Sequence, residues 1–173
     1  MSTLTRPPAG LVPPPGRVLP PRARALRPAP AEAPPLKDHR ALAVWRDGIN
    51  RAALARFREA LPVVLYALTG PGGDPHADLA AAQGYADAHR LLVVDRIVDF
   101  LNAGDQASAY DPHRRRGYTR ALHLMGDPSS ATRGLVTISQ TAVTPVGRLY
   151  EAQLALYAAR STALHLVRGE TEI

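Results

Sequence analysis

The sequence predicts an α/β fold: an open, doubly wound, mostly parallel sheet of about four strands, preceded by an extra N-terminal helix. After Pro62, short continuous apolar segments alternate with segments of helical character. Continuous apolar strands are typical of parallel sheets that are covered on both faces. Since crossovers between parallel strands are right-handed, this alternation predicts helices on both sides of an open sheet. The 173 residues suffice for one such domain and a tail.

The first 36 residues form a proline- and arginine-rich tail. Residues 1–35 hold eleven of the seventeen prolines and few apolar side chains. Such a segment cannot bury enough surface to offset the entropy of ordering, so we expect residues 1–36 to be disordered. Residues 1–40 carry a net charge of +5, whereas residues 41–173 carry +1. The near-neutral body argues against a free-standing DNA-binding domain.

Residues 37–61 are predicted to form an amphipathic helix. Asp38 is a suitable N-cap, and Gly48 weakens the helix by about 1 kcal/mol relative to alanine. Apolar side chains recur at steps of three and four residues, which makes one apolar face: Leu42, Trp45, Ile49, Ala53 and Phe57. We interpret it as a helix packed on the body with its arginines in solvent.

The body spans residues 62–173. Asp74-Pro75 and Thr144-Pro145 each have a capping side chain followed by proline, which predicts two helix starts of the same kind. The elements expected in order are strand Val63–Leu68, a helix from Asp74 to about Arg90, strand Leu91–Val98, a polar loop over Leu101–Pro112, helix Arg116–Met125, a turn region over Gly126–Gly134, strand Leu135–Ser139, a helix from Thr144 to about Arg160, and strand Leu164–Val167.

Composition excludes several classes of site. The chain has no cysteine, which excludes disulfides and thiolate chemistry, and its six histidines show no metal-ligand spacing. We therefore expect no metal and no cofactor. No apolar run approaches the roughly 18 residues of a membrane span. We expect a cytoplasmic protein without a membrane partner, and the abundance of Ala, Arg, Pro and Leu is typical of a GC-rich bacterial genome.

The first strand and its following residues, LPVVLYALTG over residues 61–70, resemble the opening of the serine recombinase (resolvase/invertase) catalytic domain. That family has a strand ending in Tyr-x-Arg-x-Ser, whose serine attacks a DNA phosphodiester with the support of arginines. Tyr66 matches the tyrosine, but Leu68 stands at the arginine position and Gly70 at the serine position. Thr69 is a weak substitute nucleophile, because alternation along a strand points it to the opposite face.

The resemblance continues along residues 62–167. Tyr85-Ala86 in the next helix and Asp99 after the next strand match family positions, whereas the loop serine is replaced by Ala103. The family's Arg-Pro-Gly becomes Arg115-Arg116-Gly117, so Arg115 is matched. The resemblance makes Arg115 a phosphate contact, and the basic cluster beside it adds DNA or phosphate contact candidates: Arg114, Arg116 and, further on, Arg148.

Two alignments compete for the C-terminal part. In the first, residues 134–137 are the third strand, and 144–160 is a third crossover helix. In the second, Thr144-Pro145-Val146-Gly147-Arg148-Leu149 matches the Thr-Pro-x-Gly-Arg-Leu that opens the family's dimerisation helix. The helix over residues 145–160 would then join a second copy or a recombinase-like partner. The architecture favours the first alignment.

The sequence therefore predicts a degenerate, catalytically inactive resolvase-like protein with a binding or structural role in DNA recombination, with DNA as a partner. One alternative is an active serine recombinase that cleaves DNA. The other is a flavodoxin-like domain that binds phosphate or a nucleotide through Gly70-Pro71-Gly72-Gly73, although this loop lacks both the Walker ending and the G-x-G-x-x-G pattern.

Overall fold

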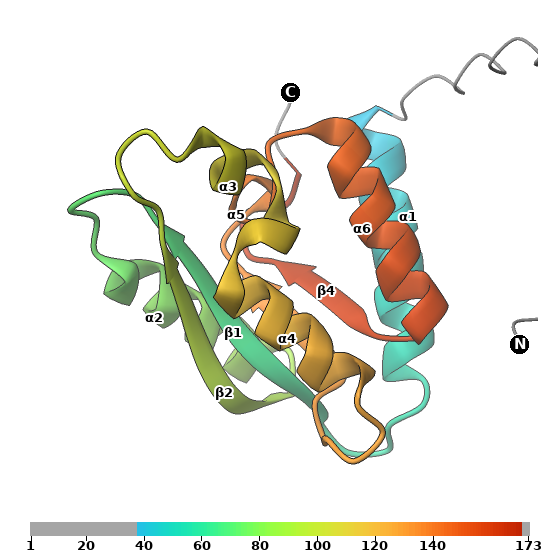
Figure 1. The fold of residues 1–173 in the computed structure, drawn as a ribbon. Coiled ribbons are helices and arrows are strands. Elements are labelled where there is room, and N and C mark those ends of the chain that lie inside the picture. Colours follow the sequence, from blue (N-terminus) through green and yellow to red (C-terminus); the bar gives the residue numbers. More distant parts are fainter. Residues whose placement is uncertain (1–37, 171–173) are drawn as a thin grey trace, which may run out of the picture. The chain divides into compact units, whose positions relative to one another are not determined.

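The structure, a computed structural model, describes residues 38–170, and the predicted disordered tail lies outside this range. Its elements follow in order as helices, strands and one short 3-10 helix (Figure 1): α1 (His39–Leu54), β1 (Leu61–Thr69), α2 (Pro75–Ala88), β2 (Leu91–Phe100), α3 (Gln106–Tyr110), η1 (Pro112–Arg114), α4 (Arg116–Gly126), β3 (Gly134–Thr137), α5 (Gln140–Val143), α6 (Gly147–Arg160) and β4 (Ala163–Leu166).

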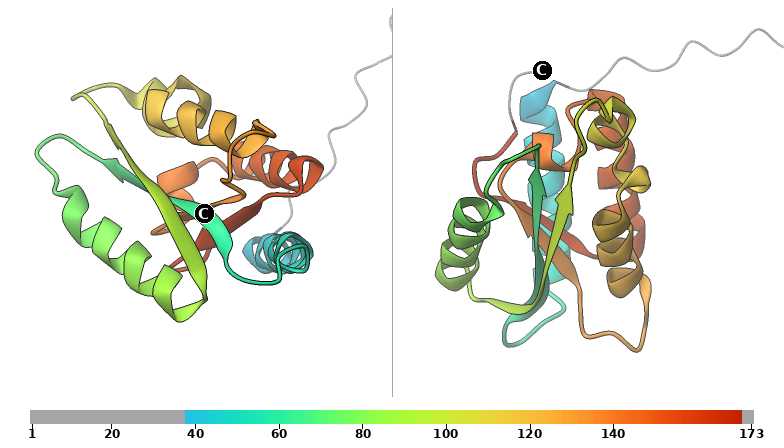
Figure 2. Two further views of the ribbon diagram at one scale, coloured as in Figure 1. Left: turned by 90° about the horizontal axis from the view of Figure 1, so that it is seen from below. Right: turned by 60° about the vertical axis from the view of Figure 1, so that its left-hand side comes forward.

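Within residues 38–170, four strands form one parallel sheet in the order β2-β1-β3-β4. This confirms the predicted α/β fold with a parallel four-stranded sheet. The chain moves outward from β1 to β2 and then returns to the other side of β1 to form β3 and β4. Because the direction of progress reverses, α2 covers one face of the sheet, and α4 and α6 cover the other (Figure 2).

Two apolar clusters fill the spaces on either side of the sheet. Val63 and Leu65 of β1 belong to the cluster under α2, whereas Val64 and Tyr66 belong to the cluster under α4 and α6. All four side chains are at most 1% exposed. Burial on both faces explains why β1 is apolar at successive positions up to Leu68 rather than at every second one.

Helix α1 lies along β4 and is bonded to it. Asp38 caps α1 as predicted, since its carboxylate accepts from the Ala41 N–H at 2.7 Å. The Asn50 carboxamide donates to the Leu164 carbonyl at 2.8 Å and accepts from the Leu164 N–H at 2.9 Å. The side chain thus supplies the pair of bonds that a neighbouring strand would make. Arg46 also bonds Glu170, with Nε to Oε1 at 2.6 Å.

Several elements differ from the sequence prediction, among them α1, the loop after β2, and α5, a short helix that was not expected before α6. Helix α1 ends at Leu54, short of residue 61, and Phe57 reaches the core from a turn in which its N–H donates to the Leu54 carbonyl at 3.0 Å. The expected polar loop over Leu101–Pro112 contains α3. Asp105 begins this helix, because its carboxylate accepts from the Ser108 N–H at 3.0 Å.

The start of α6 also differs from the prediction, whereas that of α2 does not. Asp74 caps α2 by accepting from the His76 N–H at 2.8 Å. Helix α6 begins at Gly147 with Val146 as its N-cap and without a capping side chain. Thr144 instead donates its hydroxyl to the Tyr110 carbonyl and accepts from the Val146 N–H at 3.1 Å. It therefore ties the entry of α6 to α3.

Within residues 38–170, no helix has the length and apolar character needed to cross a membrane.

Candidate functional site

Three side chains that the sequence places far apart converge at the carboxyl ends of the strands. Tyr66 lies on β1, Asp99 near the end of β2, and Arg115 directly before α4. The Tyr66 hydroxyl donates to Asp99 Oδ2 at 3.0 Å and accepts from Arg115 Nη1 at 3.4 Å. Such an edge, beside the point where the strand order reverses, is where open α/β sheets place their sites.

Arg115 is enclosed rather than presented to solvent, with an exposed fraction of 3%. Its Nε donates to the Ser108 carbonyl at 2.6 Å, and its Nη2 donates to the Ala109 carbonyl at 2.7 Å, both in α3. Its Nη1 donates to the Ala142 carbonyl of α5 at 2.7 Å. All three guanidinium nitrogens are thus engaged, and Arg115 holds α3, α5 and β1 together.

Asp99 anchors the start of α4, a role that the sequence analysis did not assign to it. Its carboxylate accepts from the N–H groups of Gly117 and Tyr118, both at 2.8 Å. Gly117 permits this approach, because a Cβ there would lie 2.8 Å from Asp99 Oδ2 and 2.6 Å from Ile97 Cγ2. The sequence does contain a signal for this contact. An acidic residue lies near the end of a strand, and a glycine follows later in the first turn of a helix.

The local environment keeps the tyrosine of this site protonated. Burial raises the pKa of the Tyr66 phenol above its ordinary value, although the adjacent Arg115 acts in the opposite direction. The protonated hydroxyl is the donor that Asp99 requires. Tyr66 is 1% exposed and its ring packs edge-on against Tyr118 at 5.5 Å. It is therefore part of the core at this edge.

The positions of the family's nucleophile hold no group that faces Arg115. Gly70 is exposed, and a Cβ there would meet no atom within 4 Å. Thr69 is 5% exposed and lies close to Gly73 on the α2 side, since its Cγ2 would be 2.9 Å from a Cβ at Gly73. Leu68 packs against the apolar cluster of the opposite face. The hydrogen bonds of Tyr66, Asp99 and Arg115 order the fold. At positions 68–70, no serine or threonine hydroxyl lies on the Arg115 side of the sheet.

The glycine-rich loop after β1 is a closed turn. The Gly73 N–H donates to the Gly70 carbonyl at 3.0 Å, and Gly72 has a φ of 69°. The Asp74 carboxylate occupies the N-terminus of α2, where a phosphate would bind. A bound phosphate would meet a negative charge at this position.

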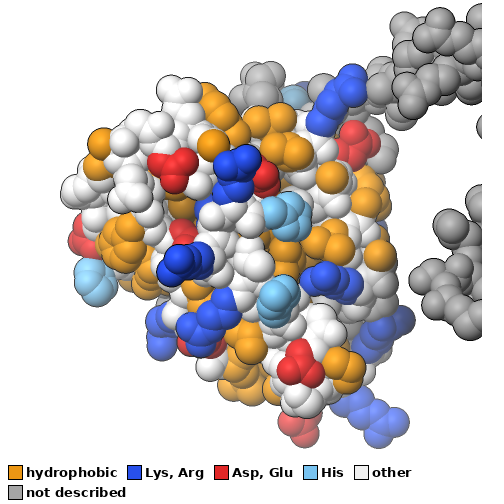
Figure 3. Space-filling model, viewed as in Figure 1, with side chains coloured by type: hydrophobic (Ala, Val, Ile, Leu, Met, Phe, Trp, Pro, Cys, Tyr) orange, Lys and Arg blue, Asp and Glu red, His pale blue; other side chains and the backbone are white. Residues whose placement is uncertain are grey.

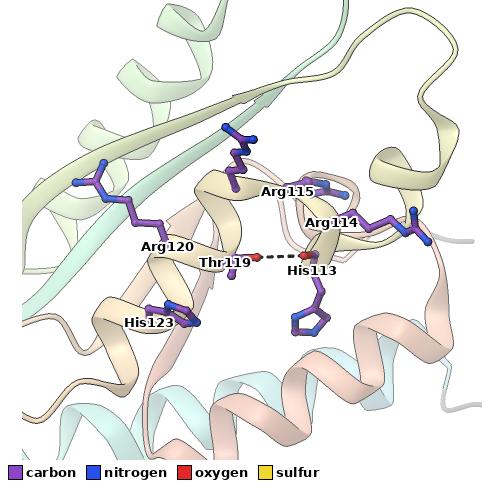
Figure 4. A pocket seen from close by; sticks show the side chains of 7 residues that line it. His113, Arg114, Arg115, Thr119, Arg120 and His123 are labelled. Carbon is purple, nitrogen blue, oxygen red and sulfur yellow. Dashed lines mark hydrogen bonds between the residues drawn. The ribbon is translucent and has the colours of Figure 1, made fainter.

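A second basic group lies on the outer surface of η1 and α4. A hollow of about 380 Å³ is lined by His113, Arg114, Arg115, Arg116, Thr119, Arg120 and His123. Figure 3 shows arginine and histidine side chains gathered over this part of the surface. In Figure 4, Arg120 extends toward β2, whereas the rings of His113 and His123 point toward α6. Of the predicted contact candidates, Arg114 and Arg116 are exposed here, and Arg148 on α6 does not line the hollow.

Helix α6 is the crossover between β3 and β4, which lie side by side and parallel. This agrees with the first of the two alignments. Its side chains Tyr150, Leu154 and Tyr157 are at most 1% exposed and belong to the chain's own core. The Tyr157 hydroxyl lies 3.3 Å from that of Tyr118. These apolar groups are therefore used within the chain.

Two more buried polar residues at this end of β3 escaped the sequence analysis. Thr137 and Gln140 are both 0% exposed, and within residues 38–170 neither the Thr137 hydroxyl nor the Gln140 carboxamide has a hydrogen-bond partner. Nothing in the local sequence distinguishes them from surface polar residues. In the same described range, no group of three or more His, Asp or Glu side chains is placed to hold a metal ion.

The fold is similar to that of serine recombinase catalytic domains. The C-terminal catalytic domain of ISC1926 TnpA, an IS607-like serine recombinase, matches with a TM-score of 0.53 and 18% identity over 63% of this chain and 72% of that chain. The N-terminal catalytic domain of TP901-1 integrase matches with a TM-score of 0.52 and 12% identity over 61% and 76%. No protein-family model matches the chain, and no curated protein matches it significantly. The expected resemblance is thus confirmed at the level of fold.

Proposed function

We propose that this chain is a non-catalytic protein with a serine recombinase fold, which takes part in DNA recombination by binding rather than by cutting DNA. The enclosure of Arg115 carries this proposal. A guanidinium that is 3% exposed and bonded through all three nitrogens cannot also neutralise a phosphodiester in the transition state.

The surroundings of the enclosed arginine support the same conclusion. Gly70 has no side chain to attack phosphorus, and Leu68 supplies no charge. Thr69 lies on the α2 side of the sheet, away from Tyr66 and Arg115. Nucleophile and charge support are therefore missing together. As part of the same proposal, we place the protein in the bacterial cytoplasm, where its DNA partner is found.

A search for a covalent intermediate tests the proposal. The full chain is incubated with a pool of labelled random-sequence duplexes, and covalent protein–DNA adducts are sought on denaturing gels, with an active serine recombinase and its own site as positive control. We expect no adduct. An adduct that disappears in Thr69→Ala would overturn the proposal and support the alternative of an active enzyme.

A second experiment uses Gly70→Ser, which restores a serine at the position of the family's nucleophile. The position has room for the side chain, so the variant is expected to fold. We expect it to form no adduct either, because Arg115 remains enclosed and Leu68 remains apolar. An adduct in this variant would show that the enclosure of Arg115 does not prevent chemistry, which is the observation on which the proposal rests.

A further inference from the structure

We propose that the exposed basic surface of η1 and α4 binds the phosphate backbone of duplex DNA. This basic surface is defined by Arg114, Arg116, Arg120, His113 and His123, around the hollow of about 380 Å³. The inference rests on the proposed function in taking DNA as the partner, and it moves the contact from the enclosed strand edge to the outer side of α4.

The surface concentrates positive charge on a body that is nearly neutral. Residues 112–126 contain no Asp or Glu, whereas residues 41–173 as a whole have a net charge of +1. Since Arg115 is buried, the exposed charge of this stretch comes from Arg114, Arg116 and Arg120. A local cluster of this kind attracts a polyanion although the mean charge of the body does not.

These three arginines are available to an external anion. The pair between Arg114 and Asp111 is long, at 3.7 Å, and the Arg114 side chain is 64% exposed. Arg120 bonds Asp95 at 2.8 Å, yet its side chain is 63% exposed. Within residues 38–170, the Arg116 side chain has no hydrogen bond or ion pair. Exposed pairs contribute little, so exchange with a phosphate is not opposed strongly.

The positive groups are side chains rather than the end of the helix. The N–H groups of Gly117 and Tyr118, which would otherwise point at an anion, are occupied by Asp99. Arg116, Arg120 and His123 follow one another at steps of four and three residues, which places them on one side of α4 along about 10 Å of its axis. The surface is thus a short row of cations.

The lining favours a duplex backbone over single-stranded bases. The hollow itself contains no Phe, Tyr or Trp on which an unpaired base would stack, and the exposed Phe100 lines a neighbouring hollow that shares Arg114 and Arg116. Duplex DNA presents one charge per ~1.7 Å of axis, twice the density of one strand, so a row of arginines gains more from it. We therefore expect binding that is independent of base sequence and sensitive to salt.

The test measures fluorescence anisotropy of a labelled random-sequence duplex of about 20 base pairs with the full chain over a series of salt concentrations. The variant is Arg116→Gln with Arg120→Gln. The matched control is Arg56→Gln with Arg58→Gln, which removes the same charge from two exposed positions between α1 and β1. Circular dichroism verifies that both variants fold.

We expect the α4 variant to bind roughly ten-fold more weakly at 0.1 M salt and to lower the slope of log K against log salt by about 1.8, the value for two lost phosphate contacts. The Arg56→Gln, Arg58→Gln control should lower the affinity and the salt slope by less than half as much as the α4 variant does. Replacing both residues by lysine should restore most of the slope, since the charge returns.

Three outcomes would overturn the inference: an unchanged slope in the α4 variant, equal losses in both double variants, or tighter binding of the single strand than of the duplex. The first two would assign binding to the basic residues 1–36 or to net charge alone. None of these outcomes produces or removes a covalent adduct, so failure here is distinguishable from failure of the non-catalytic proposal.

Discussion

Replacing Arg115 by alanine tests whether this residue stabilises the fold or serves instead to bind a phosphate group. Its guanidinium donates to carbonyls of Ser108, Ala109 and Ala142 and to the Tyr66 hydroxyl. A hydrogen bond from a charged donor contributes about 1.5–3 kcal/mol, and leaving its buried acceptor unpaired adds a desolvation cost. The α3 carbonyls are only partly buried and regain water, so the contributions do not add fully.

We expect Arg115→Ala to lower the free energy of unfolding by about 3–5 kcal/mol, which is less than the sum of its charged hydrogen bonds because the partly buried carbonyls regain water. Urea unfolding, followed by Trp45 fluorescence and far-UV circular dichroism, measures this change. Arg115→Lys keeps the charge but loses the planar fork, and should fall between alanine and wild type. Arg116→Ala is the matched control: its exposed side chain predicts a change within about 0.5 kcal/mol.

The reasoning would be refuted if Arg115→Ala unfolded within about 1 kcal/mol of wild type. The guanidinium would then be dispensable for the fold, and the result would favour the phosphate-binding role that the resemblance to serine recombinases implies for Arg115.

Three further changes have expected outcomes. Gly117→Ala places a Cβ 2.6 Å from Ile97 Cγ2, which should lower the free energy of unfolding by about 1–3 kcal/mol and lower the melting temperature accordingly. An unchanged melting temperature would contradict this. Asn50→Ala leaves both backbone groups of Leu164 without their partner, which should cost about 1–3 kcal/mol and speed hydrogen exchange of the Leu164 amide; unaltered exchange would count against the contact. Burial lowers the pKa of His165 to about 4, so only the unfolded chain binds a proton between pH 6.5 and pH 4. Stability should be intact above pH 6.5 and fall by about 3 kcal/mol toward pH 4. His165→Phe should flatten this dependence in urea titrations, and an undiminished slope would refute the assignment.

Local signals predicted those elements whose ends depend on neighbouring residues alone. Asp74-Pro75 begins α2 as expected, because the carboxylate reaches an N–H two residues away. Thr144-Pro145 has the same local pattern, but the Thr144 hydroxyl bonds the Tyr110 carbonyl, which lies far away in sequence. Tertiary contact therefore moved the start of α6 beyond the position that the sequence indicated.

The candidate site was predictable in its members but not in their roles. The resemblance to serine recombinases singled out Tyr66 and Arg115, and they do meet. Nothing in the run Arg114-Arg115-Arg116 shows which arginine is buried, because that depends on where α4 begins relative to β1. Asp99 fixes where α4 begins by accepting hydrogen bonds from its first N–H groups. This role depends on the packing of β2 against α4, which the local sequence does not show.

The bonds between Asn50 and Leu164 have a consequence for the order in which the chain folds. They join residues separated by 114 positions, so the first described helix docks on the last strand of the sheet. During synthesis, α1 emerges long before β4, and its partner backbone does not exist until the rest of the sheet has been made. Such long-range closure slows folding, since the loop entropy is lost before the contact forms. The apolar side of α1, including Ile49, must meanwhile stay exposed, which makes the growing chain a candidate for chaperone binding.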